Sequence, residues 1–278
     1  MRISYDARGL AEPVAQAPRV ATVESGENGL VAVFDAAELT TRQINLELRR
    51  LVYDEGVAEV TIRNPGAKHS LAVGILARCR ITIEGSLGYF GCGLIDGPEI
   101  HITGRVGWSV AENMMSGVVV IDKNSGSLTG AALRGGDVVV RGDVGARSGI
   151  DQKGGTIIVG GNAGMMTGFM LQRGRQVICG NVGGGLGDSM YDGAIYVGGK
   201  VTSLGVDCVE AELDASDDEF LARKLGIYGI EAPLASAILA SRDSAPKLIP
   251  VMYTGMSSSS GWLAKRAPTT VLVSHFSR

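Results

Sequence analysis

The chain has 278 residues, enough for one large domain or two small ones, and its net charge of −3 lacks the basic excess of a nucleic-acid binder. No apolar run reaches about 18 residues, so we expect no membrane span. The opening MRISYDARGL lacks the apolar core of a signal peptide, which predicts a cytoplasmic protein. The four cysteines form no C-x-x-C pair, so we expect buried thiols and no metal on this chain.

The first predicted elements are a strand at 29–35 (GLVAVFD) and a helix that begins after Thr40. Thr40 and Gln43 have the spacing of a capping box. One face of this helix would carry the apolar residues Ile44, Leu48, Leu51 and Val52. We assign residues 1–57 to an N-terminal strand and a helix that caps the open end of the following domain.

A repeat dominates the domain that we place at residues 58–209. After an irregular coil at 59–79, units of 19 residues begin at residues 80, 99, 118, 137, 156, 175 and 194 without an insertion. Positions two and four are apolar, as in Ile81 and Ile83, which is the alternation of a strand with one face inward. Positions eight and sixteen add two further apolar segments. Three such segments describe a triangular coil, so we predict a mainly β fold, a single-stranded parallel β-helix with short flanking helices.

Glycine supplies 41 residues, about twice its usual share of roughly 7%, and recurs in columns. The sixth and ninth positions hold Gly85, Gly104, Gly142, Gly161, Gly180, Gly199, Gly88, Gly107, Gly126, Gly145, Gly164 and Gly183. Because glycine adopts positive φ without steric cost, we interpret these columns as repeated backbone corners. GGNAG at 160–164 follows a strand as a phosphate loop would, but its recurrence in every unit favours a structural role.

The third position should point out of the coil, yet in five units it is apolar: Val120, Val139, Ile158, Val177 and Tyr196. An apolar row on an outer face is typical of an interface. We therefore expect this row to be covered, either by a terminal segment of the chain or by a partner subunit. By contrast, His101 occupies the same position in an earlier unit and is interpreted as a surface histidine, not a general base.

The repeat ends near residue 210. Residues 210–245 are predicted to form a second, helical cap, whose first turn carries the acidic residues Asp217, Asp218 and Glu219 that favour a helix N-terminus. Residues 246–278 are rich in serine, as in MSSSSGWLAKRAP, and we expect a tail that is poorly ordered or bound to a partner.

Together, the seven units, the stretch TTRQINLELRRLVYDEGVAEVTIRNPGAKHSLAVGI and the motif LARKLGIYGIEAP resemble the GXGXG family, named for the domain at the C-terminal end of the glutamate synthase large subunit. The resemblance runs from about residue 30 to about residue 233 and implies a right-handed β-helix, the hand expected of parallel crossovers. No match extends beyond Lys247.

The resemblance implies a non-catalytic scaffold subunit, with no catalytic residue, cofactor or metal on this chain. As a separate polypeptide it is most similar to the β-helix subunit of N-methylglutamate synthase, which joins methylamine to glutamate and releases ammonia. Its partners would be a glutaminase-type amidotransferase subunit and an FMN-binding subunit that also carries an iron–sulfur cluster, in a cytoplasmic hetero-oligomer.

Three alternatives remain. The same family includes the β-helix subunits of formylmethanofuran dehydrogenase and of the formyltransferase/hydrolase complex. The chain is also similar to domain 3 of glutamate synthase standing alone. A free carbohydrate-active β-helix enzyme would need clustered acidic residues in an outer groove, and the outward positions here are apolar or scattered.

Overall fold

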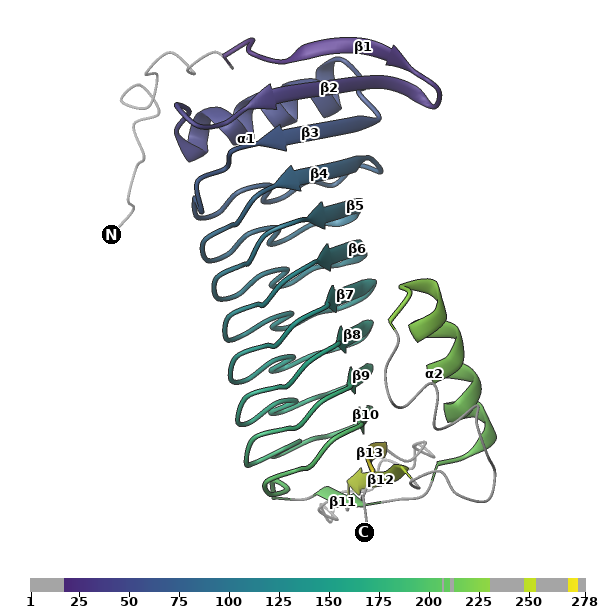
Figure 1. Ribbon diagram of the computed structural model, residues 1–278. Coiled ribbons are helices and arrows are strands. Elements are labelled where there is room, and N and C mark those ends of the chain that lie inside the picture. Colours follow the sequence, from purple (N-terminus) through teal and green to yellow (C-terminus); the bar gives the residue numbers. More distant parts are fainter. Residues whose placement is uncertain (1–17, 207, 211–212, 231–247, 254–269, 275–278) are drawn as a thin grey trace, which may run out of the picture.

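The computed structural model describes residues 18–206, 208–210, 213–230, 248–253 and 270–274, and only the backbone of the last two segments. The chain winds into a β-solenoid whose strands form one 13-stranded sheet (Figure 1). Neighbouring strands from β2 to β10 pair in parallel, so each turn of the solenoid adds one rung to the same sheet. The predicted fold class, a mainly β parallel solenoid, is confirmed.

The repeated units supply one strand each. These strands are β4 (Arg80–Glu84), β5 (Asp96–Ile102), β6 (Ser116–Ile121), β7 (Asp137–Val140), β8 (Thr156–Val159), β9 (Arg175–Ile178) and β10 (Ala194–Val197). The register joins equal unit positions, since Ile81 lies opposite Ile100 and Val138 opposite Ile157. Position eight forms a second ladder of parallel bridges, which runs from Leu87 through the units to Val201. Both ladders face one continuous core.

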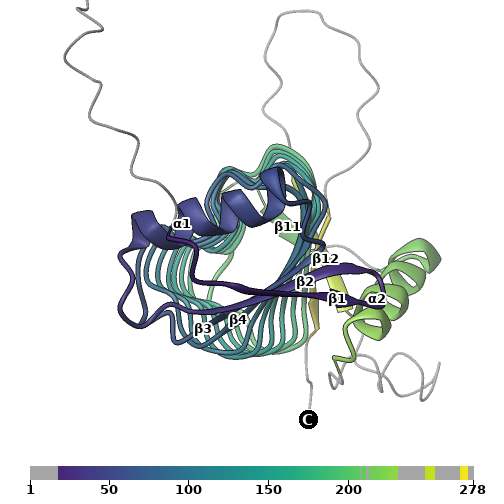
Figure 2. The same ribbon diagram turned by 90° about the horizontal axis from the view of Figure 1, so that it is seen from above.

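The N-terminal end is closed by a strand pair and a helix. β1 (Thr22–Gly26) pairs antiparallel with β2 (Gly29–Asp35), which pairs with β3 (Glu59–Arg63). Between β2 and β3, α1 (Thr41–Arg49) and a π-helical turn (Arg50–Asp54) lie across the end of the solenoid (Figure 2). The predicted capping box is present, and the four predicted apolar residues of this helix are buried. The sequence did not predict β1.

A buried carboxylate links this helix to the chain before β1. Glu47 is fully buried, and its side chain accepts hydrogen bonds from the backbone N–H groups of Val20 and Ala21 and from the Arg50 guanidinium. Burial by itself would raise the pKa of Glu47, but these donors outweigh it and the pKa lies below the ordinary value. The ionised carboxylate therefore fixes the entry of the chain onto the cap.

The glycine columns have a different cause from the one we predicted. All twelve glycines lie at the corners beside the second ladder, but only Gly85 has a positive φ. Instead, the coils touch backbone to backbone at these corners. A Cβ on Gly104 would lie 2.4 Å from the carbonyl carbon of Gly85 in the preceding coil, and a Cβ on Gly164 would lie 2.6 Å from the amide nitrogen of Ala146. Glycine is required because stacked coils leave no room for a side chain.

Positive φ occurs elsewhere in the unit. The thirteenth position adopts it in six consecutive units, four times with glycine and also at Cys92 and Ala111. The eleventh and fifteenth positions adopt it as well, mostly with residues other than glycine, such as Leu128 and Asp151. This alternation of conformations turns the chain back toward the sheet. Because positive φ is unfavourable for residues with a Cβ, the ladders on either side must hold these turns in place.

A polar ladder that the sequence analysis missed runs beside the glycine corners. At the seventh position, the side-chain oxygens of Asn124, Asp143, Asn162 and Asn181 each accept the backbone N–H of the same position in the next coil, at 2.7–3.2 Å. A column of Asn and Asp at one unit position was the available signal. The ladder supplies acceptors for N–H groups at a corner where the strand hydrogen bonds have ended.

The C-terminal end differs from the predicted helical cap. After β11 (Cys208–Glu210), α2 (Ala215–Ile227) begins at the N-cap residue Asp214 and runs along the side of the solenoid, not across its end (Figure 1). The end is instead occupied by β11, β12 (Leu248–Tyr253) and β13 (Thr270–Ser274), and β13 pairs in parallel with β10. The prediction of a poorly ordered tail is therefore corrected for these two segments; its other residues, and 231–245 of the predicted cap, lie outside the described residues.

Strand pairing explains this correction. Without β13, the last regular strand, β10, would expose a row of unpaired N–H and C=O groups, which is a template for unwanted pairing. Both helices serve the solenoid as caps or covers. Over the described ranges, neither is long and apolar enough to cross a bilayer.

The corner glycines generate a stability prediction. Gly104→Ala would push a Cβ into the backbone of the preceding coil, so we expect the free energy of unfolding to fall by about 1–3 kcal/mol, as for other overpacked sites. Urea denaturation monitored by circular dichroism measures the loss. Gly226→Ala is the matched control, because a Cβ at this helical glycine meets no atom within 4 Å and should be neutral or stabilising. Equal effects of the two substitutions would contradict the stacking argument.

Candidate functional site

The row that we predicted as an interface is covered by the chain itself. Val139, Ile158, Val177 and Tyr196 are fully buried, and Val120 at the end of the row is half-buried. Phe220, Leu221 and Leu225 of α2 pack onto them and form a second core outside the solenoid. The sequence analysis allowed either a terminal segment of the chain or a partner subunit as the cover, and in the structure the cover is the chain's own segment α2. As an interface to a partner subunit, the prediction is corrected.

Polar contacts attach both ends of α2 to the sheet. At its start, the Tyr196 hydroxyl donates to Asp217 at 2.6 Å, and the Arg175 guanidinium lies 4.2 Å above the Phe220 ring. At its end, the Asp137 carboxylate pairs with Lys224 at 2.6 Å and accepts the Tyr228 hydroxyl. Burial, and next the hydrogen bond to a carboxylate, raises the pKa of both tyrosines. Both hydroxyls stay protonated and the helix is held firmly.

The rest of the same outer face is charged. Arg80 lies between Glu59 and Glu99, Arg63 pairs with Glu84, and Asp122 bridges His101 and Arg141. Most of these side chains are more than a third exposed, so each pair contributes little stability. His101 is a surface histidine, as predicted, and its ring lies 2.9 Å from the Asp122 carboxylate. This half of the face is a solvated ladder of compensated charges.

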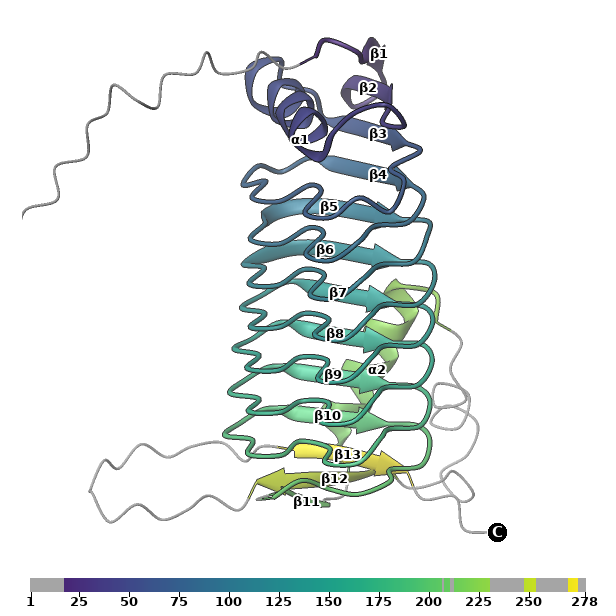
Figure 3. The same cartoon turned by 90° about the vertical axis from the view of Figure 1, so that its left-hand side faces the viewer.

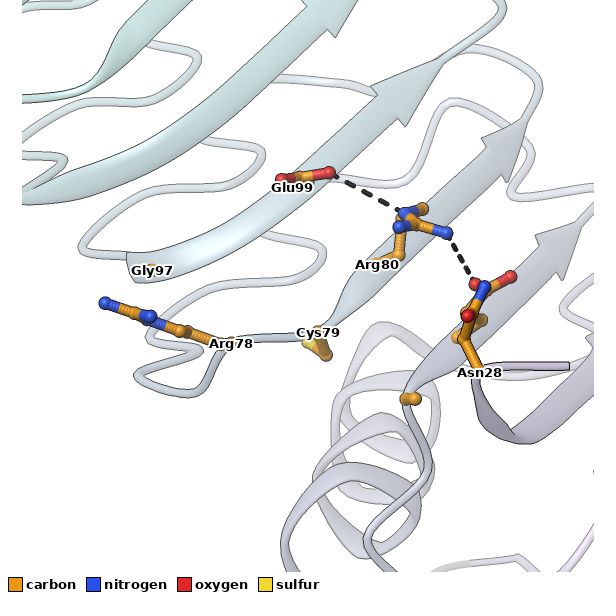
Figure 4. Close-up of a pocket in the computed structure, with 8 residues that line it drawn as sticks. Asn28, Arg78, Cys79, Arg80, Gly97 and Glu99 are labelled. Atoms are coloured by element: carbon orange, nitrogen blue, oxygen red, sulfur yellow. Dashed lines mark hydrogen bonds and ion pairs between the residues drawn. The ribbon is translucent and has the colours of Figure 1, made fainter.

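A hollow of about 380 Å³ lies at the edge of this ladder, between the N-terminal cap and β5 (Figure 4). Arg78, Cys79, Arg80 and Glu99 are among its lining residues, and the guanidinium of Arg80 lies between two carboxylates. Cys79 is a poor nucleophile because burial raises the pKa of its thiol to about 11. Arg80 and its two carboxylates in this hollow are thus ion-paired, and the Cys79 thiol is protonated.

Burial also decides the state of the other cysteines. It raises the pKa of Cys92 and of Cys179 to about 12, and both side chains are buried, as the sequence predicted. Cys208 is half-buried, and its thiol donates to the carbonyl of Gly187. Within the described ranges, no three His, Cys, Asp or Glu side chains gather closely enough to hold a metal ion.

The remaining surface is the side formed by the turns at unit positions ten to eighteen, here called the turn face. In the six complete units, from residue 80 to residue 193, six large apolar side chains are strongly exposed, and all six lie on it: Tyr89, Leu94, Trp108, Met115, Met165 and Tyr191. Figure 3 shows the stacked turns with α2 behind the strands. The sequence analysis missed this surface because its apolar residues do not share one column. The signal was the recurrence of large apolar residues at positions ten, fifteen and seventeen.

The contacts of α2 generate a prediction about Asp137. Removing its charge in Asp137→Asn should weaken the attachment of α2 by about 2 kcal/mol, because Lys224 then lies beside the sheet without a counter-charge. Hydrogen exchange of the α2 amides should accelerate more than tenfold, while amides in β4 to β6 keep their rates. Glu84→Gln, which breaks the exposed pair with Arg63, is the control and should leave exchange unchanged. Uniform acceleration over the whole chain would contradict a local role.

The buried thiols generate a second prediction. At pH 8 a thiol with a pKa of about 11 is ionised in roughly one molecule in a thousand, so Cys79, Cys92 and Cys179 should not react with a disulfide reagent within minutes. In the folded protein we expect at most one thiol, Cys208, to be titrated, and all four after denaturation in guanidinium chloride. Rapid labelling of Cys79 in the folded protein would show that the hollow at β3–β5 contains a reactive group.

Comparisons with known proteins agree with the solenoid fold. No protein-family model matches the chain. Over 89 residues the chain is 39% identical to Protein GlxC of Rhizobium meliloti (strain 1021), a stretch that spans 32% of this chain and 39% of GlxC. The match therefore covers well under half of that relative's length.

A solved structure matches along almost the whole fold. A chain of the formyltransferase/hydrolase complex (FhcABCD) from Methylorubrum extorquens, determined in complex with methylofuran, superposes with a TM-score of 0.64 at 19% identity. The superposition covers 87% of this chain and 95% of that chain. At this identity the likeness establishes a shared fold. The chain is thus similar in sequence to part of GlxC and in fold to a component of a multi-subunit complex.

Proposed function

We propose that this chain is the non-catalytic scaffold subunit of a multi-subunit enzyme. The observation that supports it most is the fold likeness, which spans 95% of a chain from an assembly of several different subunits. A likeness of this extent leaves little of that component without a counterpart here. Over 89 residues the chain is also similar to Protein GlxC.

The geometry suits a scaffold. Nine strands from β2 to β10 stack in parallel, which at about 4.8 Å per rung gives a rod roughly 40 Å long. Its corners are locked by backbone contact and by the Asn ladder, so the rod resists bending. A rigid rod with α2 on one side and open turns on another holds two partners at a fixed separation, which matters where an intermediate passes between active sites.

Within this class, we propose a glutamate-synthase-type flavoenzyme, N-methylglutamate synthase, as the complex. The reaction consumes methylamine and glutamate and yields N-methylglutamate and ammonia. A glutaminase-type amidotransferase subunit and an FMN-binding subunit with an iron–sulfur cluster would supply the chemistry, and this chain would bridge them. The proposal rests on the terminal motifs TTRQINLELRRL and LARKLGIYGIEAP, which resemble the glutamate-synthase branch.

The second candidate is the β-helix component of a formyltransferase/hydrolase complex, and the solved structure favours it directly. In that case the partners would act on formyl groups, and no flavin would be needed. A stand-alone domain 3 of glutamate synthase is the third candidate. In that case the partners would combine ammonia from glutamine with 2-oxoglutarate, in a step that needs a two-electron reductant, to form glutamate.

Purification of the native complex through a tag on this chain tests the proposal. We expect a complex with a flavin absorbance near 450 nm that forms N-methylglutamate from methylamine and glutamate, while the chain by itself is colourless and inactive. Mass spectrometry identifies the proteins that copurify. A colourless complex that transfers or hydrolyses formyl groups would replace the first candidate by the second, and glutamine-dependent glutamate formation would favour the third. Catalysis by the isolated chain would contradict a scaffold role.

A further inference from the structure

The middle of the turn face combines apolar and basic groups. In the units that begin at residues 118, 137 and 156, this face carries apolar side chains that are partly or strongly exposed: Leu128, Ile150, Met165, Met166, Phe169 and Met170. Met165 is the most exposed of them, at 59%. Backbone hydrogen bonds between adjacent turns, such as Asp151 N–H to the Phe169 carbonyl at 2.9 Å, hold the three turns side by side. We call these six residues the turn-face patch.

Basic side chains lie on the same turns as the turn-face patch. The same turns contain four basic residues, Arg134, Arg147, Lys153 and Arg173, and one acidic residue, Asp151, whereas the whole chain has a net charge of −3. Lys153 pairs with Asp151. The three guanidiniums are exposed, and none forms an ion pair or a side-chain hydrogen bond within the described part of the chain. They therefore lie in solvent on the same turns as the apolar side chains.

We infer that the turn-face patch is the docking surface for a catalytic subunit of the complex, one that presents apolar side chains bordered by carboxylates. Arginines are frequent in protein interfaces, and methionines adapt their shape to a partner. Carboxylates opposite Arg134, Arg147 and Arg173 would steer the encounter and fix the register of the partner along the rod. This inference rests on the proposed scaffold function and adds which face the partner occupies and what chemistry it carries.

Charge excludes the other occupants. Two copies of this chain joined through the turn-face patch would place basic groups opposite basic groups. The longer chain segments outside the described residues lack the negative charge that would complement this face. Residues 1–17 and 231–247 have no net charge, and 254–269 carries only the basic residues Lys265 and Arg266. The opposite side of the sheet is already covered by α2 or fully ion-paired. An acidic partner is the occupant that complements this face.

Charge reversal tests the inference. The proteins that copurify with the full-length chain are prepared separately, and their affinity for it is measured at 50 and 200 mM NaCl. We expect R134E/R147E/R173E to weaken binding of one of them about tenfold or more at low salt, and the weakening to shrink at high salt. R105E/K123E/K200E is the matched control, because it reverses three exposed charges at the opposite corner and should change affinity less than twofold.

An apolar substitution provides an independent arm. Met165→Glu should also weaken binding at least tenfold, whereas Ile227→Glu on α2, at a site of similar exposure (63%), should not. Both sites are solvent-exposed, so the variants should keep the thermal midpoint of the parent chain. Hydrogen exchange of the assembled complex should slow at residues 128–134, 147–153 and 165–173. Unchanged affinity for the triple Arg variant, or slowing confined to the charged ladder on β3 to β6, would overturn the inference.

The outcomes separate this inference from the proposed function. A complex without flavin contradicts N-methylglutamate synthase but supports the docking surface if the turn-face patch is protected by an acidic subunit. A flavin complex in which the patch exchanges freely overturns the docking surface alone. The pure chain can be examined for self-association by sedimentation. Self-association that Met165→Glu abolishes would assign the patch to a second copy and overturn the inference. Recovery of no partner protein would also overturn it.

Discussion

The contact on which the structure depends is the approach of backbone to backbone where successive coils turn. At the sixth and ninth positions of the unit, a Cβ would lie well inside the contact distance of the coil before it. This approach allows the coils to stack at the spacing of hydrogen-bonded strands, with equal positions opposite one another. The apolar and polar columns of the sequence follow from that stacking, because each residue lies opposite the residue at the same unit position in the next coil.

The same register explains the division of the outer sheet face. Where an outward-facing column is charged, opposite charges must lie next to one another, as they do from Glu59 to Arg141. Where such a column is apolar, another part of the protein must cover it. From Val120 onward the third column is apolar, and α2 covers it. The charged part of the face gives way to the apolar part near β7, where Asp137 forms an ion pair with Lys224 near the end of α2. The solenoid thus presents one side occupied by its own chain and another side, the turns, that is open.

An open side with exposed apolar groups is unusual for a chain that acts alone, since large exposed apolar patches are characteristic of interaction sites. The hollow beside Arg80 contains compensated charges and a protonated thiol, so it offers little to a substrate. The chain is similar in sequence to part of GlxC and in fold to one chain of a multi-subunit complex. These features are the basis of our proposal that the chain is a rigid element between other proteins.

The period of 19 residues, the glycine columns and the alternation at positions two and four determined the β-solenoid, because a strict repeat can be satisfied only by a repeated backbone path. The capping box of α1 was also local, since a cap depends on residues three positions apart. The sequence could not show why glycine is required at the corners, because positive φ and close stacking select the same residue. Only the position of the adjacent coil distinguishes the two causes.

Tertiary structure alone decided that α2 covers the Val139 to Tyr196 row, that β13 pairs with β10, and that exposed apolar and basic residues from three coils share one face. These contacts join residues far apart in sequence, and no local pattern records which distant segment meets a given surface.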